Sequence, residues 1–299
     1  MGDTETEAKQ EIQNKMAEAI FDSQLLVSFV QNLHFFEFEA RKDVSSIFAT
    51  LCRNYPEQTT SYVTLHRDII DLLVNGYVES TIALTCGGML RELIRHEDVC
   101  KLILAPPNLN QASNTTQPQV TPHLERFFGF VQLPVFDIAS DAFSTLKLLL
   151  TKHKKYCAKF LEQNFTEFFT KYTQLLLLSD SYVTKRLGLK LLAELLLTRE
   201  NFVIMMKFIE ITDYLKITMS LLRGTTKTIQ IEAFHVFKIF VANPRKSDPI
   251  KSILYRNRPK LIEFLNGFQK DRNDEQFHEE KSILLATLVN LEPPPGVEP

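Results

Sequence analysis

The stretch SYVTKRLGLKLLAELLLTRENF, residues 181–202, combines a leucine-rich helical pattern with an aromatic and basic stripe. At about 100° per residue, one broad arc of the helical wheel holds Val183, Leu187, Gly188, Leu189, Leu191, Leu192, Leu195 and Leu196. The remaining stripe carries Tyr182, Arg186, Lys190 and Glu194 at intervals of about one turn. The stretch predicts a helix with a wide buried face and a narrow face that is either a solvated edge or a recognition surface.

The same helical pattern extends through the central part of the chain. Residues 135–243 contain no proline, and their only glycines are Gly188 and Gly224. Apolar residues recur at helical spacing in this span, with short polar joints such as SDS and RGTTKT between the segments. These observations predict an all-α fold.

The apolar segments also resemble one another. When those that start at Phe38, Val78, Phe136, Tyr182 and Lys227 are aligned, one column holds the small residues Ser46, Cys86, Ala142, Gly188 and Ala233. Successive members are 40, 56, 46 and 45 residues apart, and the longest interval contains a Pro/Asn/Gln/Thr-rich insert. Without the insert the period falls in the low forties, which is typical of armadillo and HEAT repeats. Small residues at one register would let neighbouring helices approach closely, which explains a glycine in a helix interior.

The repeat predicts an all-α, armadillo/HEAT-like helical repeat superhelix, or α-solenoid. We expect an N-terminal helical segment or cap at residues 1–35 and a repeat domain at residues 36–290. Within that domain, residues 105–122 are expected to form a mobile surface loop, because they are too polar to bury. Residues 291–299, which include EPPPGVEP, are expected to be a disordered tail.

Composition excludes several classes of function. A chain of 299 residues with 44% hydrophobic residues can bury a large core. Its 34 basic and 36 acidic residues give a net charge of -2, so it has no basic surface of the kind that nucleic-acid binding needs. The polar start of the chain does not resemble a signal peptide, and no apolar run approaches the roughly 20 residues that span a bilayer. We expect a soluble cytoplasmic protein with no membrane span and no nucleic-acid partner.

Catalytic and metal-binding motifs are missing from the sequence. It has no phosphate-binding glycine loop and no G-x-S-x-G nucleophile motif. His96 and Cys100 are one helical turn apart, as are His153 and Cys157, but the two pairs fall in different repeats, whereas zinc needs three or four ligands. We therefore expect no enzyme, no metal and no cofactor. A metal hydrolase would need further ligands near His96 or His153.

The acidic run DRNDEQFHEE, residues 271–280, superficially resembles a calcium-binding loop. It has Gln276 where an EF-hand requires glycine, and Ser282 where the bidentate glutamate belongs. A solvated helix junction is the better interpretation of this run. The cysteines are widely spaced in the sequence, and we expect them to be small core residues.

A second column of the repeat alignment points to a binding surface. Six residues before the small column, the segments carry Ala40, Ser80, Phe136, Tyr182 and Lys227. The two adjacent aromatic residues lie beside Arg186 and Lys190, and aromatic rings and guanidinium groups dominate the energetics of protein interfaces. Phe136 could instead be a hydrophobic staple at the start of its helix. Spacing alone leaves both interpretations open.

Several blocks of the sequence resemble a known family. TIALTCGGMLRELIRHE, FDIASDAFSTLKLLLTKHK, YVTKRLGLKLLAELLLTRENF, IQIEAFHVFKIFVANP and KLIEFLNGFQKDRNDEQF are similar, in one register, to the calcium-binding protein 39 family, also called the Mo twenty-five scaffold. The resemblance runs from about residue 38 to residue 280. It implies an armadillo-like, non-catalytic scaffold for signalling and cell polarity, and not a calcium sensor.

The resemblance also implies partners. Members of that family bind STRAD pseudokinases, support the liver kinase B complex, and bind and activate germinal-centre kinases of the sterile-twenty class. It implies a monomer within a heteromeric complex that holds the kinase fold on its concave face and allosterically stabilises the active kinase conformation. A separate pocket would take a short hydrophobic tail motif of Trp-Glu-Phe type.

Matching motifs transfer specific residues to this sequence. The face for the kinase or pseudokinase would consist of Phe136, Tyr182, Arg186, Lys190, Arg199 and Phe202. The tail-motif pocket would involve Met219, Arg256 and Lys260, although position 256 resembles a lysine in the better-known members. The alternative function is a general armadillo-type adaptor that binds extended peptides. Such adaptors typically use tryptophans along their groove, and this chain has none.

Overall fold

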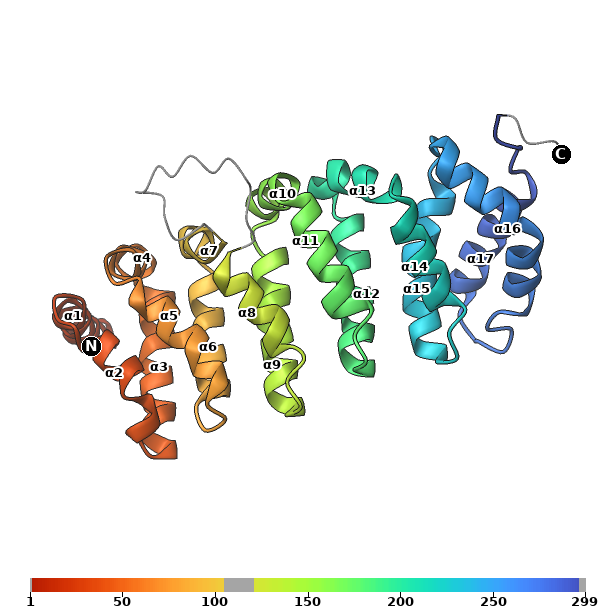
Figure 1. Cartoon of the computed structure of the whole chain (residues 1–299). Coiled ribbons are helices and arrows are strands. Elements are labelled where there is room, and N and C mark those ends of the chain that lie inside the picture. Colours follow the sequence, from red (N-terminus) through yellow and green to blue (C-terminus); the bar gives the residue numbers. More distant parts are fainter. Residues whose placement is uncertain (1, 105–120, 296–299) are drawn as a thin grey trace, which may run out of the picture. The chain divides into compact units, whose positions relative to one another are not determined.

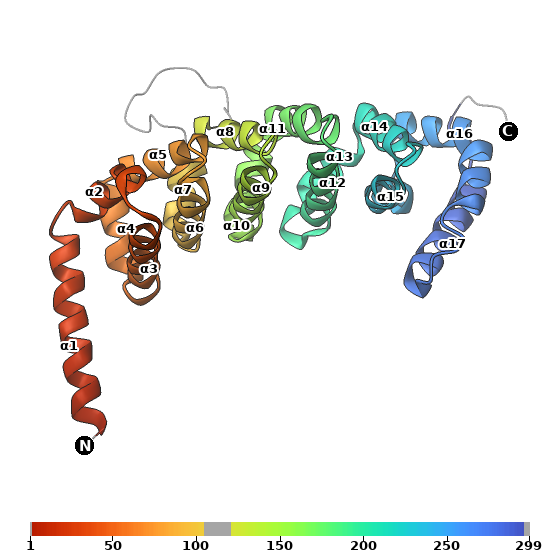
Figure 2. The same ribbon diagram turned by 90° about the horizontal axis from the view of Figure 1, so that it is seen from below.

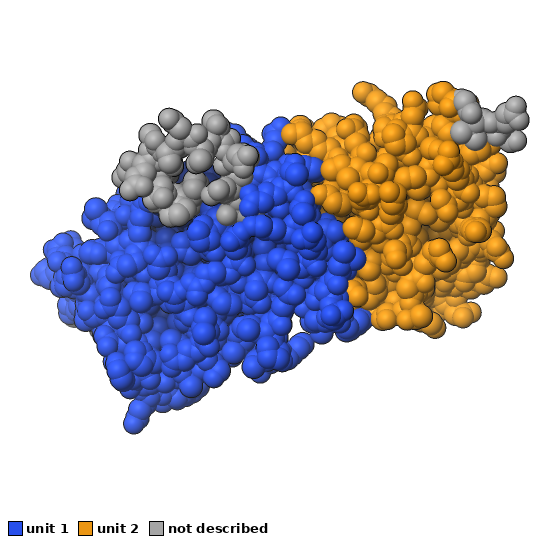
Figure 3. All heavy atoms as spheres, in the orientation of Figure 1, with its two compact units in different colours: residues 1–184 blue, residues 185–299 orange. Residues whose placement is uncertain are grey.

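The computed structural model describes the backbone of residues 2–104 and 121–295, and the side chains of residues 9–104 and 121–295. Every regular element in these ranges is helical (Figures 1 and 2). The chain divides into two compact units, residues 1–184 and residues 185–299, and the division falls inside helix α12 (Figure 3).

In unit 1 the helices α3 (Phe38–Asn54), α6 (Ala83–Ile94) and α9 (Phe136–Thr151) lie side by side in both ribbon views, and shorter helices connect them (Figures 1 and 2). Its α-helices are α1 (Gly2–Phe21), α2 (Leu25–Gln31), α3 (Phe38–Asn54), α4 (Pro56–Leu65), α5 (Asp68–Asn75), α6 (Ala83–Ile94), α7 (Glu97–Leu104), α8 (Pro122–Phe130), α9 (Phe136–Thr151), α10 (Lys154–Gln163), α11 (Phe165–Tyr172) and the start of α12 (Tyr182–Leu197). Two 3₁₀ helices, η1 (Leu33–Phe35) and η2 (Gly76–Val78), and the π-helix η3 (Thr173–Leu177) connect some of them. Helix α6 packs against α3 on one side and α9 on the other.

Unit 2 repeats the alternation of longer and shorter helices. After the rest of α12 come the turn η4 (Arg199–Asn201) and the helices α13 (Phe202–Ile209), α14 (Thr212–Leu222), α15 (Lys227–Ala242), α16 (Asp248–Gly267) and α17 (Glu275–Val289). Helix α15 packs against α14 and α17, and a cluster of the buried rings of Phe234, Phe268 and Phe277 closes its core. The all-α, solenoid-type fold class predicted from the repeat is thus confirmed.

Helix starts follow the sequence pattern closely. Four of the aligned segments begin at the residue where the structure begins the helix: α3 at Phe38, α9 at Phe136, α12 at Tyr182 and α15 at Lys227. The fifth segment was aligned from Val78, but α6 begins only at Ala83, because Val78 ends the 3₁₀ helix η2 and residues 79–82 form a bend and turn. None of the helices in the described residues combines the length and the apolar character that a membrane-spanning helix needs.

The column of small residues is buried at four of its five positions. Cys86, Ala142, Gly188 and Ala233 are buried, as close packing of the long helices requires. Ser46 is exposed, so the column is wrong at its first member. The reason is positional: α3 packs mainly against α4 and α6, and it leaves the face that carries Ser46 in solvent.

Helices α6 and α9 also approach each other closely at a glycine outside that column. A β-carbon on Gly87 would lie 2.0 Å from Asp141 Oδ2 and 2.4 Å from the Tyr77 hydroxyl oxygen. These two groups are themselves hydrogen-bonded at 2.7 Å, so neither is free to move aside. Gly87 therefore lets a buried polar contact form between the helices.

We expect Gly87→Ala to lower the free energy of unfolding by about 1–3 kcal/mol through overpacking, although alanine favours a helix by about 1 kcal/mol. Gly88→Ala is the matched control, because no atom lies within 4 Å of its β-carbon position. The free energy of unfolding of Gly88→Ala should rise by up to about 1 kcal/mol, because alanine favours a helix. Chemical denaturation followed by circular dichroism measures both, and equal effects of the two substitutions would contradict the close-packing account.

The expected insert and tail lie partly outside the described residues. Residues 105–120 of the insert and residues 296–299 of the tail are not described. The last two insert residues are ordered: the Thr121 hydroxyl accepts a hydrogen bond from the Leu124 amide as the N-cap of α8, and Pro122 is the first residue of that helix. At the start of the tail, Leu291 is 9% exposed and its carbonyl accepts a hydrogen bond from Arg258.

Candidate partner-binding site

The stripe on α12 is largely exposed, while its leucine arc is buried. Tyr182 is 44% exposed, and Arg186 and Lys190, each one turn further along, are also exposed. Leu189, Leu191, Leu192, Leu195 and Leu196 are each at most 1% exposed. The helix therefore presents an aromatic ring and two cations to solvent on the face opposite its core contacts.

The three cations of the expected binding face that lie on unit 2 differ in their ion-pair partners. The Arg186 Nε atom lies 3.6 Å from a carboxylate oxygen of Glu232, which is mostly buried on α15. This ion pair orients the guanidinium group but leaves its side chain 47% exposed. Lys190 has no ion pair or side-chain hydrogen bond among the described residues, nor has Arg199 in the turn η4. On unit 2, Lys190 and Arg199 are therefore exposed cations without an ion pair among the described residues, while Arg186 is an exposed cation paired with Glu232.

Phe136, on unit 1, is the first residue of α9, and the residue is 62% exposed. Val135 is the N-cap, so Phe136 is not at the position before the cap that a hydrophobic staple uses. The buried Thr184 hydroxyl donates a hydrogen bond to the Val131 carbonyl at 2.9 Å. This bond ties the first turn of α12, which carries Tyr182, to the link that leads into α9.

Phe202 is the first residue of α13, and its ring is 60% exposed. The preceding residue, Asn201, is buried, and its side-chain amide donates to the Leu195 carbonyl at 2.9 Å. That hydrogen bond fixes the corner between α12 and α13 and so positions the ring. Phe202 lies at the edge of a groove of about 790 Å³ within unit 2.

The groove was not predicted from the sequence. Its lining comes from the end of α12, from α13, from α15 and the loop after it, and from α17, and it includes Leu197, Met205, Met206, Ile239 and Ile283. Leu197 is 63% exposed and Ile283 is 60% exposed. One sequence signal was available: α13 reads FVIMMKFI, with a single polar residue, so it carries more apolar surface than one buried face can cover.

The structure places only one residue of the predicted tail-motif pocket, Met219, in the lining of a hollow. Met219 on α14 lines a hollow of about 500 Å³ together with Arg223, the C-cap residue of that helix, and with Ile253 and Asn257 on α16. Arg256 and Lys260 are exposed on α16 and do not line this hollow. Helix α14 packs against α16, so the two cations lie on a helix that forms one wall of the hollow.

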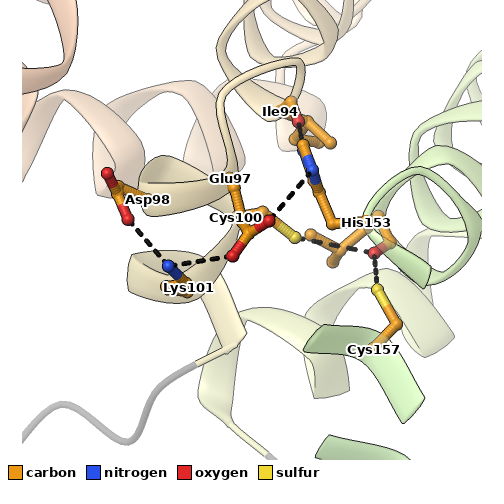
Figure 4. Close-up of polar contacts among 8 residues, drawn as sticks. Ile94, Glu97, Asp98, Cys100, Lys101, His153 and Cys157 are labelled. Atoms are coloured by element: carbon orange, nitrogen blue, oxygen red, sulfur yellow. Dashed lines mark hydrogen bonds and ion pairs between the residues drawn. The ribbon is translucent and has the colours of Figure 1, made fainter. Parts of the chain in front are cut away.

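The two His/Cys pairs come closer together than the repeat assignment indicated. Helices α7 and α10 pack against each other, and both Cys100 and Cys157 hydrogen-bond to the Leu149 carbonyl, at 3.7 Å and 3.2 Å (Figure 4). The His153 ring nitrogen Nε2 is 2.7 Å from the Ile94 carbonyl. These side chains are thus engaged with backbone oxygens. No group of three or more His, Cys, Asp or Glu residues that could hold a metal ion is found in the described ranges.

The acidic run at residues 271–280 forms a helix junction. Asp274 is the N-cap of α17: its carboxylate accepts the Phe277 amide at 3.0 Å and pairs with Arg272 at 2.7 Å. The hydrogen bond to that amide, followed by the one from Arg272, lowers the pKa of Asp274. The other cysteines are core residues, and burial raises the pKa of Cys52 and of Cys86 to about 12.

His96 makes stability depend on pH. Burial lowers the pKa of its imidazole, partly offset by a hydrogen bond to the Cys52 backbone, and the buried Nε2 atom has no hydrogen-bond partner among the described residues. The unfolded ring therefore binds a proton at higher pH than the folded ring does. The neutral His96 ring therefore contributes its full share of the unfolding free energy above the unfolded pKa of about 6.5, and this share is lost as the pH falls from there through the lower pKa of the folded ring.

We expect His96→Gln to flatten the decline in unfolding free energy between pH 7 and pH 5. The control is His34→Gln, the same substitution at an exposed histidine. Urea denaturation across this pH range measures the slope. If His96→Gln and wild type have parallel profiles, His96 is not the titrating group.

Taken together, the described helices define a helical-repeat protein of the α-solenoid class with exposed aromatic and cationic residues. The model of the Mo25-like family matches residues 1–292. The chain is 46% identical over 294 residues to "Calcium-binding protein 39-like" of Homo sapiens, covering 97% of this chain and 82% of that protein. It is 45% identical over 294 residues to "MO25-like protein 2" of Caenorhabditis elegans, with the same shares covered. It is 41% identical over 296 residues to the "Mo25-like protein" of Schizosaccharomyces pombe, covering 97% of this chain and 84% of that protein.

The chain belongs to the Mo25-like family. This confirms the family resemblance read from the sequence blocks. Family membership supports a scaffold-type protein that binds partners, and it agrees with the helical repeat fold.

Proposed function

We propose that this protein is a non-catalytic scaffold that binds a protein kinase or pseudokinase and stabilises its active conformation. The expected partners are a STRAD-type pseudokinase, a germinal-centre kinase of the sterile-twenty class, or a complex of liver kinase B type. The proposal rests on family membership and on the exposed residues that the family motifs single out.

One observation carries the proposal: the face of α12 opposite its buried leucines exposes Tyr182, Arg186 and Lys190 one turn apart. A helix that served only the core would not need an aromatic ring 44% exposed beside a guanidinium group held by Glu232. Rings and guanidinium groups are the side chains that contribute most to binding when a partner buries them. Phe136 on unit 1, and Arg199 and Phe202 on unit 2, add further contacts of the same kind.

The mechanism requires differential binding and no covalent chemistry. A scaffold shifts a kinase toward its closed, active arrangement only by binding that arrangement more tightly than the inactive one. A tenfold preference corresponds to about 1.4 kcal/mol, which one well-packed aromatic contact can supply. The hollow beside Met219, with Arg256 and Lys260 on α16, is the proposed second contact, for a short hydrophobic and acidic tail motif of the partner.

Affinity purification tests the proposal. The tagged full chain is recovered from cells, and its stoichiometric partners are identified by mass spectrometry. We expect a protein kinase or pseudokinase among them, at about one copy per copy of this chain. Stoichiometric partners without any kinase fold would instead favour a general peptide-binding adaptor.

A further inference from the structure

The groove next to Phe202 is built like a binding site for an apolar partner segment. Its volume of about 790 Å³ lies within the range of about 300–1,000 Å³ that is typical of ligand pockets. Its rim exposes Leu197, Phe202 and Ile283, from three different helices, each by at least 60%. Met205 and Met206 line it with flexible side chains that can adapt to a ligand. Three large apolar side chains converging on one hollow mark an interaction site rather than scattered surface residues.

The charges around the groove are unequal. On its walls, Lys238 of α15 and Glu280 of α17 form an ion pair at 2.5 Å, so the carboxylate is already neutralised. Burial, and then the nearby Lys238, lower the pKa of His235, so this ring adds no charge at neutral pH. Arg245, in the loop after α15, is exposed, and its guanidinium group has no partner among the described residues. The groove therefore presents an unpaired positive charge beside an apolar floor, and it complements a segment that is apolar and acidic.

The helical architecture limits how such a segment can bind. The groove walls are α-helices, whose backbone groups are already paired, and no strand edge is present in the described residues to extend a sheet. Recognition must then come from side chains. Apolar side chains that project from one face of a partner helix, one turn apart, can enter such a groove together.

We propose that this groove docks an amphipathic helix of a partner protein, with apolar anchors between α13, α15 and α17 and a carboxylate paired with Arg245. The site is separate from the hollow beside Met219, because the two share no lining residue. It shares Phe202 with the proposed kinase face, but helix docking does not depend on the partner being a kinase.

Selection of helical peptides on the purified full chain tests this inference. A displayed library presents amphipathic peptides of about four turns, with one face varied among apolar residues and the flanking positions varied among acidic, basic and neutral residues. We expect the enriched peptides to share apolar residues at helical spacing and at least one acidic residue. Fluorescence anisotropy of the best peptide then gives its Kd for wild type and for each variant.

Substitutions on one helix provide matched variants. Ile283→Glu places a charge on the groove rim and should weaken peptide binding at least tenfold. Val289→Glu, on the same helix and 57% exposed but outside the groove, should leave the Kd unchanged. Arg245→Glu should weaken binding of the acidic peptide. A second peptide that differs only by a lysine at the acidic position should bind the Arg245→Glu variant more tightly than the acidic peptide does.

Three results would overturn the inference: a library that yields no binder, an enriched peptide that binds Ile283→Glu as tightly as wild type, or enrichment of basic peptides only. A dimer of the chain that Ile283→Glu dissociates, measured by light scattering, would also overturn it by assigning the groove to a second copy. The assay contains no kinase, so its failure leaves the proposed kinase scaffold untouched. Conversely, if helical peptides bind the groove as expected but affinity purification recovers no kinase, only the proposed function is contradicted.

Discussion

Asp141→Asn should be among the most destabilising single substitutions in unit 1, with a loss of about 2–4 kcal/mol of unfolding free energy. Asp141 pairs with Arg91 at 2.8 Å and accepts a hydrogen bond from the Tyr77 hydroxyl at 2.7 Å. Thr145 completes the network, with its hydroxyl 2.8 Å from that of Tyr77 and 2.9 Å from an Arg91 nitrogen. The amide of asparagine keeps the shape of the carboxylate but removes its charge, which leaves the guanidinium group of Arg91 uncompensated.

The expected loss is smaller than the roughly 3–5 kcal/mol found for fully buried pairs, because solvent screens part of the interaction. The side chains of Arg91 and Asp141 are 29% and 14% exposed. Asp137→Asn is the matched control: the same substitution one turn earlier on α9, at an exposed residue. Urea denaturation of both variants gives the comparison. A difference between them below about 0.5 kcal/mol would show that the network does not hold α6 and α9 together.

If the proposed function is correct, the double substitution Arg186→Ala/Phe202→Ala should weaken binding of the proposed kinase or pseudokinase partner by about 100- to 1,000-fold. Truncation of an interface hot spot costs about 2 kcal/mol or more, and two such losses amount to about three factors of ten if they add fully. The fold should survive, because the side chains are 47% and 60% exposed. Loss of Arg186 also leaves Glu232 without its ion pair, so part of the effect is a change in local charge.

The control for Arg186→Ala/Phe202→Ala replaces an exposed cation and an exposed hydrophobic residue outside the proposed binding sites. Lys155→Ala/Val289→Ala removes an exposed lysine on α10 and an exposed valine on α17 that none of the proposed sites uses. Isothermal titration calorimetry with the recovered partner measures all three proteins. Equal affinities of the two double variants would exclude Arg186 and Phe202 from the interface, provided that both keep the wild-type circular dichroism spectrum.

The fold could be predicted from the sequence because each repeat carries its own signals. Helices α9, α12 and α15 begin at the residues where the apolar pattern begins, and the small residues Ala142, Gly188 and Ala233 are buried as the alignment required. Ser46 was misassigned because α3 packs mainly against α4 and α6 and leaves the face with Ser46 exposed, and the residue pattern does not say which neighbours a helix has.

The exposure of the candidate site residues could be predicted only where those residues lie on one helix. The exposed stripe of Tyr182, Arg186 and Lys190 follows from helical spacing alone. The groove beside Phe202 could not be predicted in the same way, because its walls come from segments far apart in the sequence. The pairing of Arg186 with Glu232 on α15 likewise depends on how two repeats pack, and spacing within one helix gives no information about it.

The most direct test of the scaffold proposal is the catalytic activity of a purified germinal-centre kinase, titrated with the purified full chain. We predict that phosphorylation of a peptide substrate rises with the concentration of the chain and saturates at one chain per kinase. Arg186→Ala/Phe202→Ala should shift the midpoint to at least about 100-fold higher concentration, in line with the expected loss of binding energy. Kinase activity that stays constant at all concentrations of the wild-type chain, for every kinase recovered with it, would contradict the proposal.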